Sequence, residues 1–446
     1  MNMQWRGSPD DFLDWLEREK RKLICYGAGS MAADILREPR FVEKITCFVD
    51  RDPNKQGKAF RGTNFPVFGP EHLREENLNH AALLITSGWF RDIIQELNEY
   101  KELQSLTCVV FPELLAACEP GSEEFFRRRI LDECVREYDS SLVQRGETED
   151  RRRQLTEEKR AYLLGDSAGS RPFVLPRIML LPTTRCNLRC KGCSSLLPLF
   201  EHTEDVPLKQ NLRDLKLFFR GIDGCIRLTV GGEPFLYPDL PALLEYLRDE
   251  DKVFSILLIT NSTIQPSREV LSILSDPKFY VEVSDYGHIQ QMSKTVAALE
   301  GAAVRFRVLS EQVWDDMGGV EARNRSEVQM REIYMNCEQG RLMKSIHNGS
   351  VFVCARSARM SALNCGYNHH CDSFVLNEGD SIKTLQEKIC GLYFRNIADA
   401  CDRCDLGYMP GKKIPAGMQI SGSLRHSSYT LIRRDEYQSL KALAER

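Results

Sequence analysis

The chain has 446 residues, of which 42% are hydrophobic and 28% are charged, a balance that is typical of a folded globular protein. Its net charge of −4 and the lack of a dense Lys/Arg stripe argue against a nucleic-acid partner. The N-terminal residues lack the apolar core of a signal peptide, and no apolar run is long enough to span a membrane. We therefore expect a cytoplasmic protein of about three domains with no membrane partner.

Residues 1–118 alternate predicted strands with helices. An apolar strand at 23–26 leads through Gly27 and Gly29 into a helix, and the next strand, 45–50, ends on Asp50. A glycine-rich turn followed by an acidic strand end is typical of a nucleotide-binding α/β fold. With further strands at 81–87 and 107–112, the pattern predicts a small doubly wound sheet of about four strands. Gly27, Gly29 and Asp50 form its candidate nucleotide site, although glycines can also serve only the turn.

The stretch from Gly27 to Leu73 is similar to the small Rossmann-like domain of polysaccharide-biosynthesis proteins and nucleotide-sugar-binding acyltransferases. The residues that carry this resemblance include Asp50 and the Asp-Pro-x-Lys-x-Gly run from Asp52 to Gly57. The resemblance implies a role in carbohydrate metabolism. Residues 119–172 are highly charged and lack strand signals, so they predict a connector of one or two solvated helices.

The sixteen cysteines indicate metal or redox chemistry, because disulfides are rare in a reducing compartment. Five of them are scattered through the first third of the chain and are interpreted as core packing: Cys25, Cys47, Cys108, Cys118 and Cys134. Three more, Cys186, Cys190 and Cys193, directly follow a predicted strand at 176–182. A structural zinc site takes four protein ligands. Three cysteines on one loop instead leave one iron of a four-iron cluster open to a substrate or cofactor.

Polar residues follow the later predicted strands in a regular order. The next strand runs into Gly231, Gly232, Glu233 and Pro234, and further strands end near Asn261 and Ser262, near Ser284 and Asp285, and around Arg305. Strands that alternate with helices predict a parallel sheet, whose carboxyl ends carry the chemistry. We expect about five strands in an open, partial (β/α) barrel over 173–325.

This ordered set of motifs, over residues 172–310, resembles the radical S-adenosylmethionine (SAM) enzymes, with Gly192 where the family commonly has an aromatic residue. The resemblance implies a 4Fe-4S cluster on Cys186, Cys190 and Cys193 and a 5′-deoxyadenosyl radical made from SAM. It also implies an electron donor such as flavodoxin or ferredoxin. The implied SAM-binding residues are Gly231, Gly232, Glu233, Pro234, Asn261, Ser262 and Ser284.

Residues 326–446 predict a small Cys-rich α+β domain that ends in a helix. A hairpin with its turn at Asn348-Gly349 brings Cys354 toward Cys337, and Cys401 and Cys404 form a C-x2-C pair. These four cysteines resemble the ligands of the twitch extension, the shortened SPASM domain, which implies an auxiliary 4Fe-4S cluster. A structural zinc site on the same cysteines stays open. Of the cysteines between them, Cys365 and Cys371 are candidate hydrogen donors.

The predicted activity is radical oxidation of a secondary alcohol on a sugar or nucleotide-sugar-like substrate, ahead of epimerisation and dehydration. A radical SAM maturase of a peptide is the second hypothesis. A nicotinamide-dependent sugar enzyme with structural zinc, and a non-catalytic metal-stabilised scaffold, are hypotheses of a different class. The motifs identify no general base.

Overall fold

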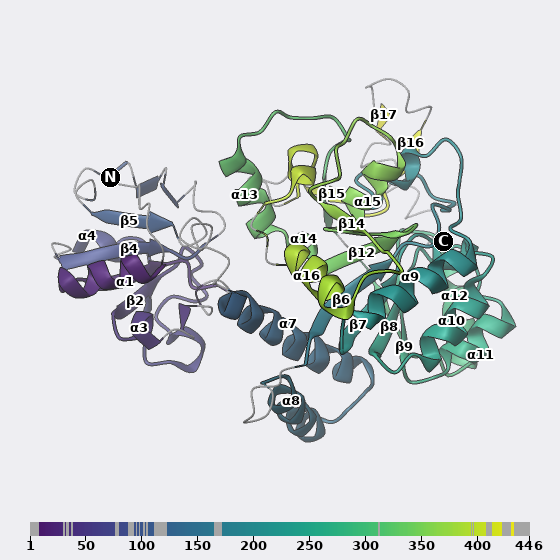
Figure 1. Cartoon of the computed structure of the whole chain (residues 1–446), viewed down its shortest axis with the longest axis horizontal. Helices are drawn as coiled ribbons and strands as arrows, with labels where there is room; N and C mark the ends of the chain where they lie inside the picture. Colours follow the sequence, from purple (N-terminus) through teal and green to yellow (C-terminus); the bar gives the residue numbers. More distant parts are fainter. Residues whose placement is uncertain are drawn as a thin grey trace. The chain divides into compact units, whose positions relative to one another are not determined.

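The computed structural model describes residues 9–29, 39–75, 80–87, 106–110, 123–164, 172–310, 313–393, 395, 397–406, 413–421 and 430–431, with a few single residues between 32 and 103. Cys118, the loop at 165–171 and the predicted C-terminal helix lie outside these residues. The chain divides into two compact units (Figure 1). The first comprises Met1–Phe125, Ser326–Asn336 and Gly407–Met409, and the second comprises Phe126–Arg325, Cys337–Leu406 and Pro410–Arg446.

The first unit contains a five-stranded, fully parallel sheet in the order β3-β2-β1-β4-β5. Its strands are β1 Lys22–Tyr26, β2 Ile45–Val49, β3 Val67–Phe68, β4 Ala81–Ile85 and β5 Thr107–Val110, and its helices are α1 Pro9–Arg18, α3 Pro39–Val42, α4 His72–Glu75 and α13 Glu327–Asn336. This strand order, which reverses between β1 and β4, is that of a doubly wound, Rossmann-like fold. The predicted fold is confirmed, but the predicted count of four strands missed β3, which is too short to show a pattern.

The second unit is built on an eight-stranded sheet in the order β10-β9-β8-β7-β6-β12-β13-β14. The parallel strands of the partial barrel are β6 Val174–Leu180, β7 Gly224–Val230, β8 Val253–Thr260, β9 Phe279–Ser284 and β10 Phe306–Leu309. These are the predicted five strands, and they confirm the barrel. The last strand begins after Arg305, so its carboxyl end is Leu309 and the expectation for Arg305 was wrong.

The predicted hairpin is present and extends this same sheet. Strand β12, Met343–His347, lies parallel to β6. Strand β13, Ser350–Phe352, pairs antiparallel with β12, and β14, Ser373–Val375, pairs antiparallel with β13. His347 pairs with Ser350 around Asn348 and Gly349, both with positive φ, as a two-residue hairpin turn requires. Two small antiparallel sheets pair β11 Val313–Asp315 with β15 Lys413–Pro415, and β16 Ile420–Ser421 with β17 Thr430–Leu431.

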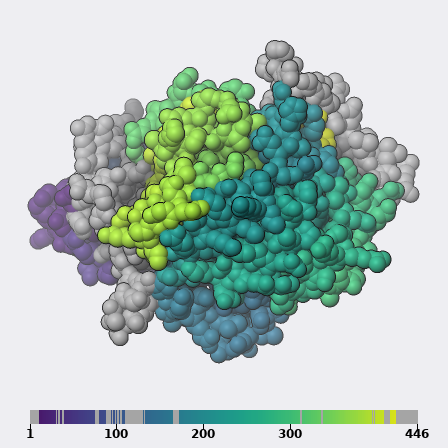
Figure 2. All heavy atoms as spheres, turned by 45° about the vertical axis from the view of Figure 1, so that its right-hand side comes forward, coloured from purple at the N-terminus to yellow at the C-terminus, as the bar shows by residue number. Residues whose placement is uncertain are grey.

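Helices cover the outer face of the barrel strands, where one continuous apolar core forms. The connecting helices are α9 Leu208–Arg220, α10 Leu240–Asp249, α11 Arg268–Leu274 and α12 Ile289–Gly301. Helix α16, Ile382–Tyr393, packs beside α9, and Arg213 and Arg220 bind the segment at Glu378 and Asp380 that precedes it. Figure 2 shows this yellow-green segment lying along the teal surface of the barrel. The shorter helices are η1 Phe60–Gly62, η5 Leu197–Leu199, η6 Pro234–Leu236, η7 Asp399–Arg403, α14 Glu338–Leu342 and α15 Ala355–Ala362.

The connector forms two helices, α7 Glu123–Gln144 and α8 Glu149–Leu164, and α7 is less solvated than predicted. Glu137 is buried and forms ion pairs with Arg177 of β6 and Arg227 of β7. One helical turn later, Ser141 shares a hydrogen bond of 3.1 Å with Ser255 of β8. The polar face of α7 is therefore buried against three strands of the partial barrel. No helix among the described residues combines the length and apolar character needed to cross a membrane.

Candidate active site

A cavity of about 420 Å³ lies at the carboxyl ends of the barrel strands. It is lined by Met179 of β6, Thr229 of β7, Ile259 of β8, Glu282 of β9 and Leu309 of β10. Most of the predicted cluster and SAM residues line the same cavity: Cys186, Cys190, Cys193, Gly231, Gly232, Glu233, Asn261 and Ser284. The structure thus brings motifs from four separate loops to one place, as expected for a parallel sheet whose strand ends share an edge. Pro234 and Ser262 do not line it.

Gly231 and Gly232 allow the loop after β7 to approach the loop after β6. A Cβ atom on Gly231 would stand 2.6 Å from Cδ2 of Leu181. A Cβ atom on Gly232 would stand 2.9 Å from the carbonyl oxygen of Thr183, and the φ of Gly232 is +88°. At Gly232 the short contact is with backbone and φ is positive, so glycine is required there, whereas a side chain at Gly231 would require the Leu181 side chain to shift.

The Glu233 carboxylate joins the ends of β7 and β8. It is 2% exposed and accepts hydrogen bonds from the Thr260 hydroxyl at 2.8 Å, the Asn261 backbone N–H at 2.8 Å and the Phe235 N–H at 3.4 Å. Burial raises its pKa from 4.5 to about 7, against the opposing effect of these bonds. The carboxylate therefore has a positioning role besides any contact with the SAM ammonium group.

Asn261 connects the end of β8 to the cysteine loop. Its side-chain amide donates to the Cys186 sulfur at 3.6 Å and to the Asn187 side-chain oxygen at 3.0 Å. The next residue, Ser262, has a φ of +62° and directs its hydroxyl to the backbone carbonyl of Ser284 at 3.3 Å. The Asn261 side chain thus points toward the cysteines, whereas the Ser262 side chain links the ends of β8 and β9 by a hydrogen bond.

The three cysteines of the loop are close enough to affect one another. The pKa of Cys186 is raised to about 11 and that of Cys190 to about 12, mainly by burial and in smaller part by the neighbouring thiols. Burial also raises the pKa of Cys193. Ligation requires thiolates, so loading a cluster here would release protons.

Three thiols on one loop beside a polar cavity fit a four-iron cluster with one iron left open. No three Cys, His, Asp or Glu side chains among the described residues already surround a point where a single ion would sit. The thiolates of a four-iron cluster instead stand around a cubane and so lie further apart than the ligands of one ion. Gly231, Gly232, Asn261 and Ser284 add backbone and polar groups beside this loop for a small polar cofactor.

A C-terminal segment that the motifs did not indicate pairs with the cysteine loop. The Gln419 side chain donates to the Cys190 sulfur at 3.1 Å and accepts from the Arg189 N–H at 2.7 Å. In the same segment Ile414 lies where a side chain on Gly192 would be, 2.6 Å from a Cβ atom built there. The departure from an aromatic residue at position 192 therefore makes room for Ile414. No local pattern could reveal Gln419, because it lies 229 residues after Cys190.

Two aromatic side chains of the cavity wall were also missed. Tyr286 and Trp314 line the cavity, and their ring centroids lie 5.4 Å apart in an edge-to-face arrangement. Trp314 belongs to β11, whose partner strand β15 comes from the C-terminal segment. Aromatic residues are common in loops, so neither position stands out in the sequence as part of a site.

The four later cysteines also form one group. Cys337 and Cys354 precede α14 and α15, and their sulfurs accept backbone N–H groups at 3.3 and 3.4 Å. Burial raises the pKa of Cys337 to about 12, that of Cys354 to about 11 and that of Cys401 well above its usual value. The Cys404 thiol adds to the rise in the pKa of each of these three cysteines, so it belongs to the same group.

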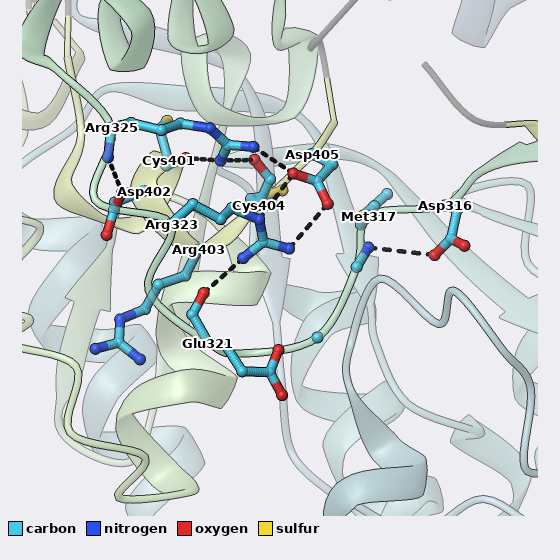
Figure 3. A network of polar contacts seen from close by, with 12 residues as sticks. Asp316, Met317, Glu321, Arg323, Arg325, Cys401, Asp402, Arg403, Cys404 and Asp405 are labelled. Atoms are coloured by element: carbon cyan, nitrogen blue, oxygen red, sulfur yellow. Dashed lines mark hydrogen bonds and ion pairs between the residues drawn. The ribbon is translucent and has the colours of Figure 1, made fainter. Parts of the chain in front are cut away.

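An arginine holds both ends of the C-x2-C pair. Arg325 donates to the backbone carbonyls of Cys401 and Cys404, each at 2.8 Å, and pairs with Asp405 (Figure 3). Arg323 binds the same carboxylate at 2.8 Å. The C-x2-C turn is therefore bound at both of its ends by arginine side chains.

A buried carboxylate links the two halves of this cysteine group. Asp372 is fully buried and accepts from the Ala400 N–H, just before Cys401, at 2.7 Å and from the Tyr367 hydroxyl at 2.5 Å. The Tyr367 hydroxyl bonds to Ser357, whose N–H binds the Cys354 sulfur. These bonds connect Cys354 to the turn that carries Cys401.

The two candidate hydrogen donors lie away from the cavity. The Cys365 thiol donates to the Met360 carbonyl at 3.4 Å within an apolar cluster, and Cys371 is exposed. Neither residue lines the cavity. Among the described residues, its only thiols are those of the three-cysteine loop.

In the first unit, the candidate nucleotide residues lie together at the carboxyl ends of β1 and β2. Asp50 accepts the Ala28 N–H at 2.7 Å and the Lys55 ammonium at 2.9 Å, so its carboxylate already holds the loop between Gly27 and Gly29. Gly27 has a φ of +112°, and a Cβ atom there would stand 3.0 Å from the Thr86 carbonyl oxygen. This geometry gives Gly27 and Asp50 structural roles and leaves nucleotide binding as a proposal.

Two family models match the chain. Residues 180–284 match the radical SAM superfamily, and residues 4–112 match the C-methyltransferase C-terminal domain. The second unit therefore contains a radical SAM domain, a class that uses a 4Fe-4S cluster and SAM, and the first contains a methyltransferase-like domain. No curated protein matches the chain.

Solved structures show weaker likenesses. The chain is 19% identical to SuiB from Streptococcus suis bound to precursor peptide SuiA, over 36% of this chain and 38% of that one, with a TM-score of 0.25. It is 17% identical to BtrN in complex with AdoMet and 2-DOIA, over 52% and 93%, with a TM-score of 0.33. A methyltransferase FkbM from Methylobacillus flagellatus KT is 12% identical over 68% and 83%, with a TM-score of 0.22. The match spans less than half the length of SuiB.

Proposed function

We propose that this radical SAM enzyme oxidises a secondary alcohol of a sugar or nucleotide-sugar-like molecule. On this proposal Cys337, Cys354, Cys401 and Cys404 hold an auxiliary 4Fe-4S cluster that accepts an electron. Such an oxidation removes one hydrogen atom, one proton and one electron from the substrate. The enzyme therefore needs a hydrogen-abstracting group, a base and an electron acceptor around one cavity.

The observation that carries the proposal is the lining of the 420 Å³ cavity. One wall is the loop of Cys186, Cys190 and Cys193. The lining also includes Gln339 and Leu406, each two positions after a cysteine of the later group. A substrate in this cavity would lie between the two sulfur sites.

When bound, the cluster and SAM supply a 5′-deoxyadenosyl radical that takes hydrogen from unactivated carbon. Gly231, Gly232, Glu233, Asn261 and Ser284 would hold SAM at the strand ends. The rings of Tyr286 and Trp314 would exclude water from the reacting carbon. The chain's own contribution is thus binding, orientation and a dry cavity.

The base would be a carboxylate of the cavity wall, which carries Glu233, Glu282 and Asp315. We assign the proton to one of these three carboxylates, of which Glu233 accepts hydrogen bonds from both strand ends and Glu282 is paired with Arg307. Epimerisation would need a second hydrogen donor, and the candidates Cys365 and Cys371 do not line the cavity. Their distance from the site favours oxidation.

The test is anaerobic formation of 5′-deoxyadenosine by iron-loaded, dithionite-reduced protein with nucleotide sugars, amino sugars, cyclitols and short peptides. We expect one sugar class to stimulate cleavage and to yield a carbonyl product. Stimulation by peptides alone would shift the activity to peptide modification. A protein that carries zinc instead of iron, or that never cleaves SAM, would refute the proposal, and Cys193→Ala is the matched inactive control.

A further inference from the structure

Helix α15 connects the two groups of cysteines. It begins directly after Cys354, and its other buried side chains include Arg356 and Arg359, which are 3% and 0% exposed. Met360 of the same helix packs against Leu196 of the loop that carries Cys193. The helix is therefore fixed against both sites.

Arg359 has an incomplete set of hydrogen-bond partners for a fully buried cation. Its Nη2 donates to the Thr183 carbonyl oxygen at 2.5 Å, whereas Nε and Nη1 have no partner among the described residues. Thr183 lies just before the cysteine loop, and its carbonyl also faces Gly232. The unpartnered N–H groups thus belong to a residue that contacts the start of the cysteine loop, at Thr183.

No described carboxylate compensates this charge. Arg356, beside it, is a second buried cation whose Nε and Nη1 also lack partners. The nearby His347 ring does not supply a compensating charge. Burial and the charge of Arg359 lower its pKa to about 4, so the ring is neutral. Buried arginines are normally paired with an anion, since taking an unpaired ion out of water is costly.

The missing anion lies on the side of the cysteine loop. Arg359 reaches the carbonyl of Thr183, three residues before Cys186, and Met360 of the same helix packs against Leu196, three residues after Cys193. Neither arginine lines the 420 Å³ cavity, so a ligand inside that cavity is not their partner. The anionic group closest to this position in the loaded enzyme is the cluster with its three thiolates.

We propose that Arg359, assisted by Arg356, is the buried counter-charge of the cluster on Cys186, Cys190 and Cys193, and that it raises the cluster's reduction potential. Reduction adds negative charge, which a fixed neighbouring cation stabilises. Hydrogen bonds and charge around the sulfurs are established determinants of cluster potential. Arg359 would therefore be a positioning and tuning residue and not a catalytic one. The inference rests on the cluster assigned to the radical SAM domain.

The test is a redox titration of the iron-loaded full-length protein, followed by the EPR signal that responds to added SAM. For Arg359→Met we expect the equilibrium constant for one-electron reduction to fall at least about tenfold, which corresponds to about 59 mV toward more negative potential. Arg359→Lys keeps the charge and should shift the potential less. Arg220→Met removes the same charge from a remote exposed position and should leave it unchanged.

Each outcome decides between explanations. A loaded Arg359→Met protein with unchanged potential would overturn the proposal and leave Arg359 as a structural contact to Thr183. Weaker SAM binding at unchanged potential would assign the guanidinium to the SAM carboxylate instead, which also overturns it. If Arg359→Met does not load iron, the Arg356→Met variant decides, and an unchanged potential in that variant refutes the idea. Failure of the wild type to load a cluster would contradict the radical SAM assignment and not this inference.

Discussion

Replacing Glu233 by glutamine should remove a pH dependence from the stability of the metal-free protein. Burial raises the pKa of this carboxyl from 4.5 to about 7. Between these two pKa values the folded protein keeps a proton on Glu233 that the unfolded chain has lost. The stabilising contribution of Glu233 is therefore fully present below the pKa of the unfolded state and is lost as the pH rises through the pKa of the folded state. At about 1.4 kcal/mol per pKa unit, this shift corresponds to a loss of about 3 kcal/mol.

The assay is urea unfolding of reduced, metal-free wild type and Glu233→Gln, below about pH 5 and above about pH 8. Glutamine resembles the protonated carboxyl but cannot ionise. The difference in unfolding free energy between the two proteins should therefore move by about 3 kcal/mol in favour of the variant as the pH rises. Glu245→Gln, an exposed change on α10, should keep a constant difference from wild type. A difference that stays constant for Glu233→Gln as well would refute the assigned burial and pKa.

Three further changes test other parts of the site. Cys193→Ala should abolish SAM cleavage and lower bound iron by about four atoms per chain, whereas alanine at the buried core cysteine Cys225 should keep both. Arg325→Met removes the bonds to the two carbonyls of the C-x2-C turn, so about half of the iron should be lost while the SAM-responsive EPR signal stays. An unchanged iron content would contradict the role assigned to Arg325. Gly232→Ala should lower the unfolding free energy by about 1–3 kcal/mol because of its positive φ and the nearby carbonyl, and a thermal melt equal to wild type would contradict this.

Much of the site could be predicted because parallel strands bring their carboxyl ends to one edge. Cys186, Gly232, Asn261 and Ser284 each follow a clear apolar strand, so their convergence required only the strand order. The residues that complete the site depend on contacts between distant segments. Gln419 meets Cys190 through a C-terminal segment with no motif, and Arg359 lies on a helix whose burial no local pattern shows.

The fold shows the same division between local and distant determinants. The alternation of strands and helices was enough to predict both parallel sheets. Strand β3 is a two-residue edge strand whose pairing depends on its neighbours and not on its own sequence. Glu137 has the appearance of a solvent-exposed residue in a charged helix, yet two arginines inside the barrel pair with it. Charge patterns alone do not distinguish a solvated face from a buried ion-pair network.

The parallel pairing of β12 with β6 has a consequence for folding during synthesis. Strand β6 is the first of the barrel to leave the ribosome, but the strand that covers its second edge is synthesised more than 160 residues later. During that interval an apolar strand with unpaired N–H and C=O groups is open to pairing with other chains. Ending translation before Met343 would leave that edge permanently uncovered. A nascent chain therefore depends on its last third for protection against aggregation, whether or not iron is available.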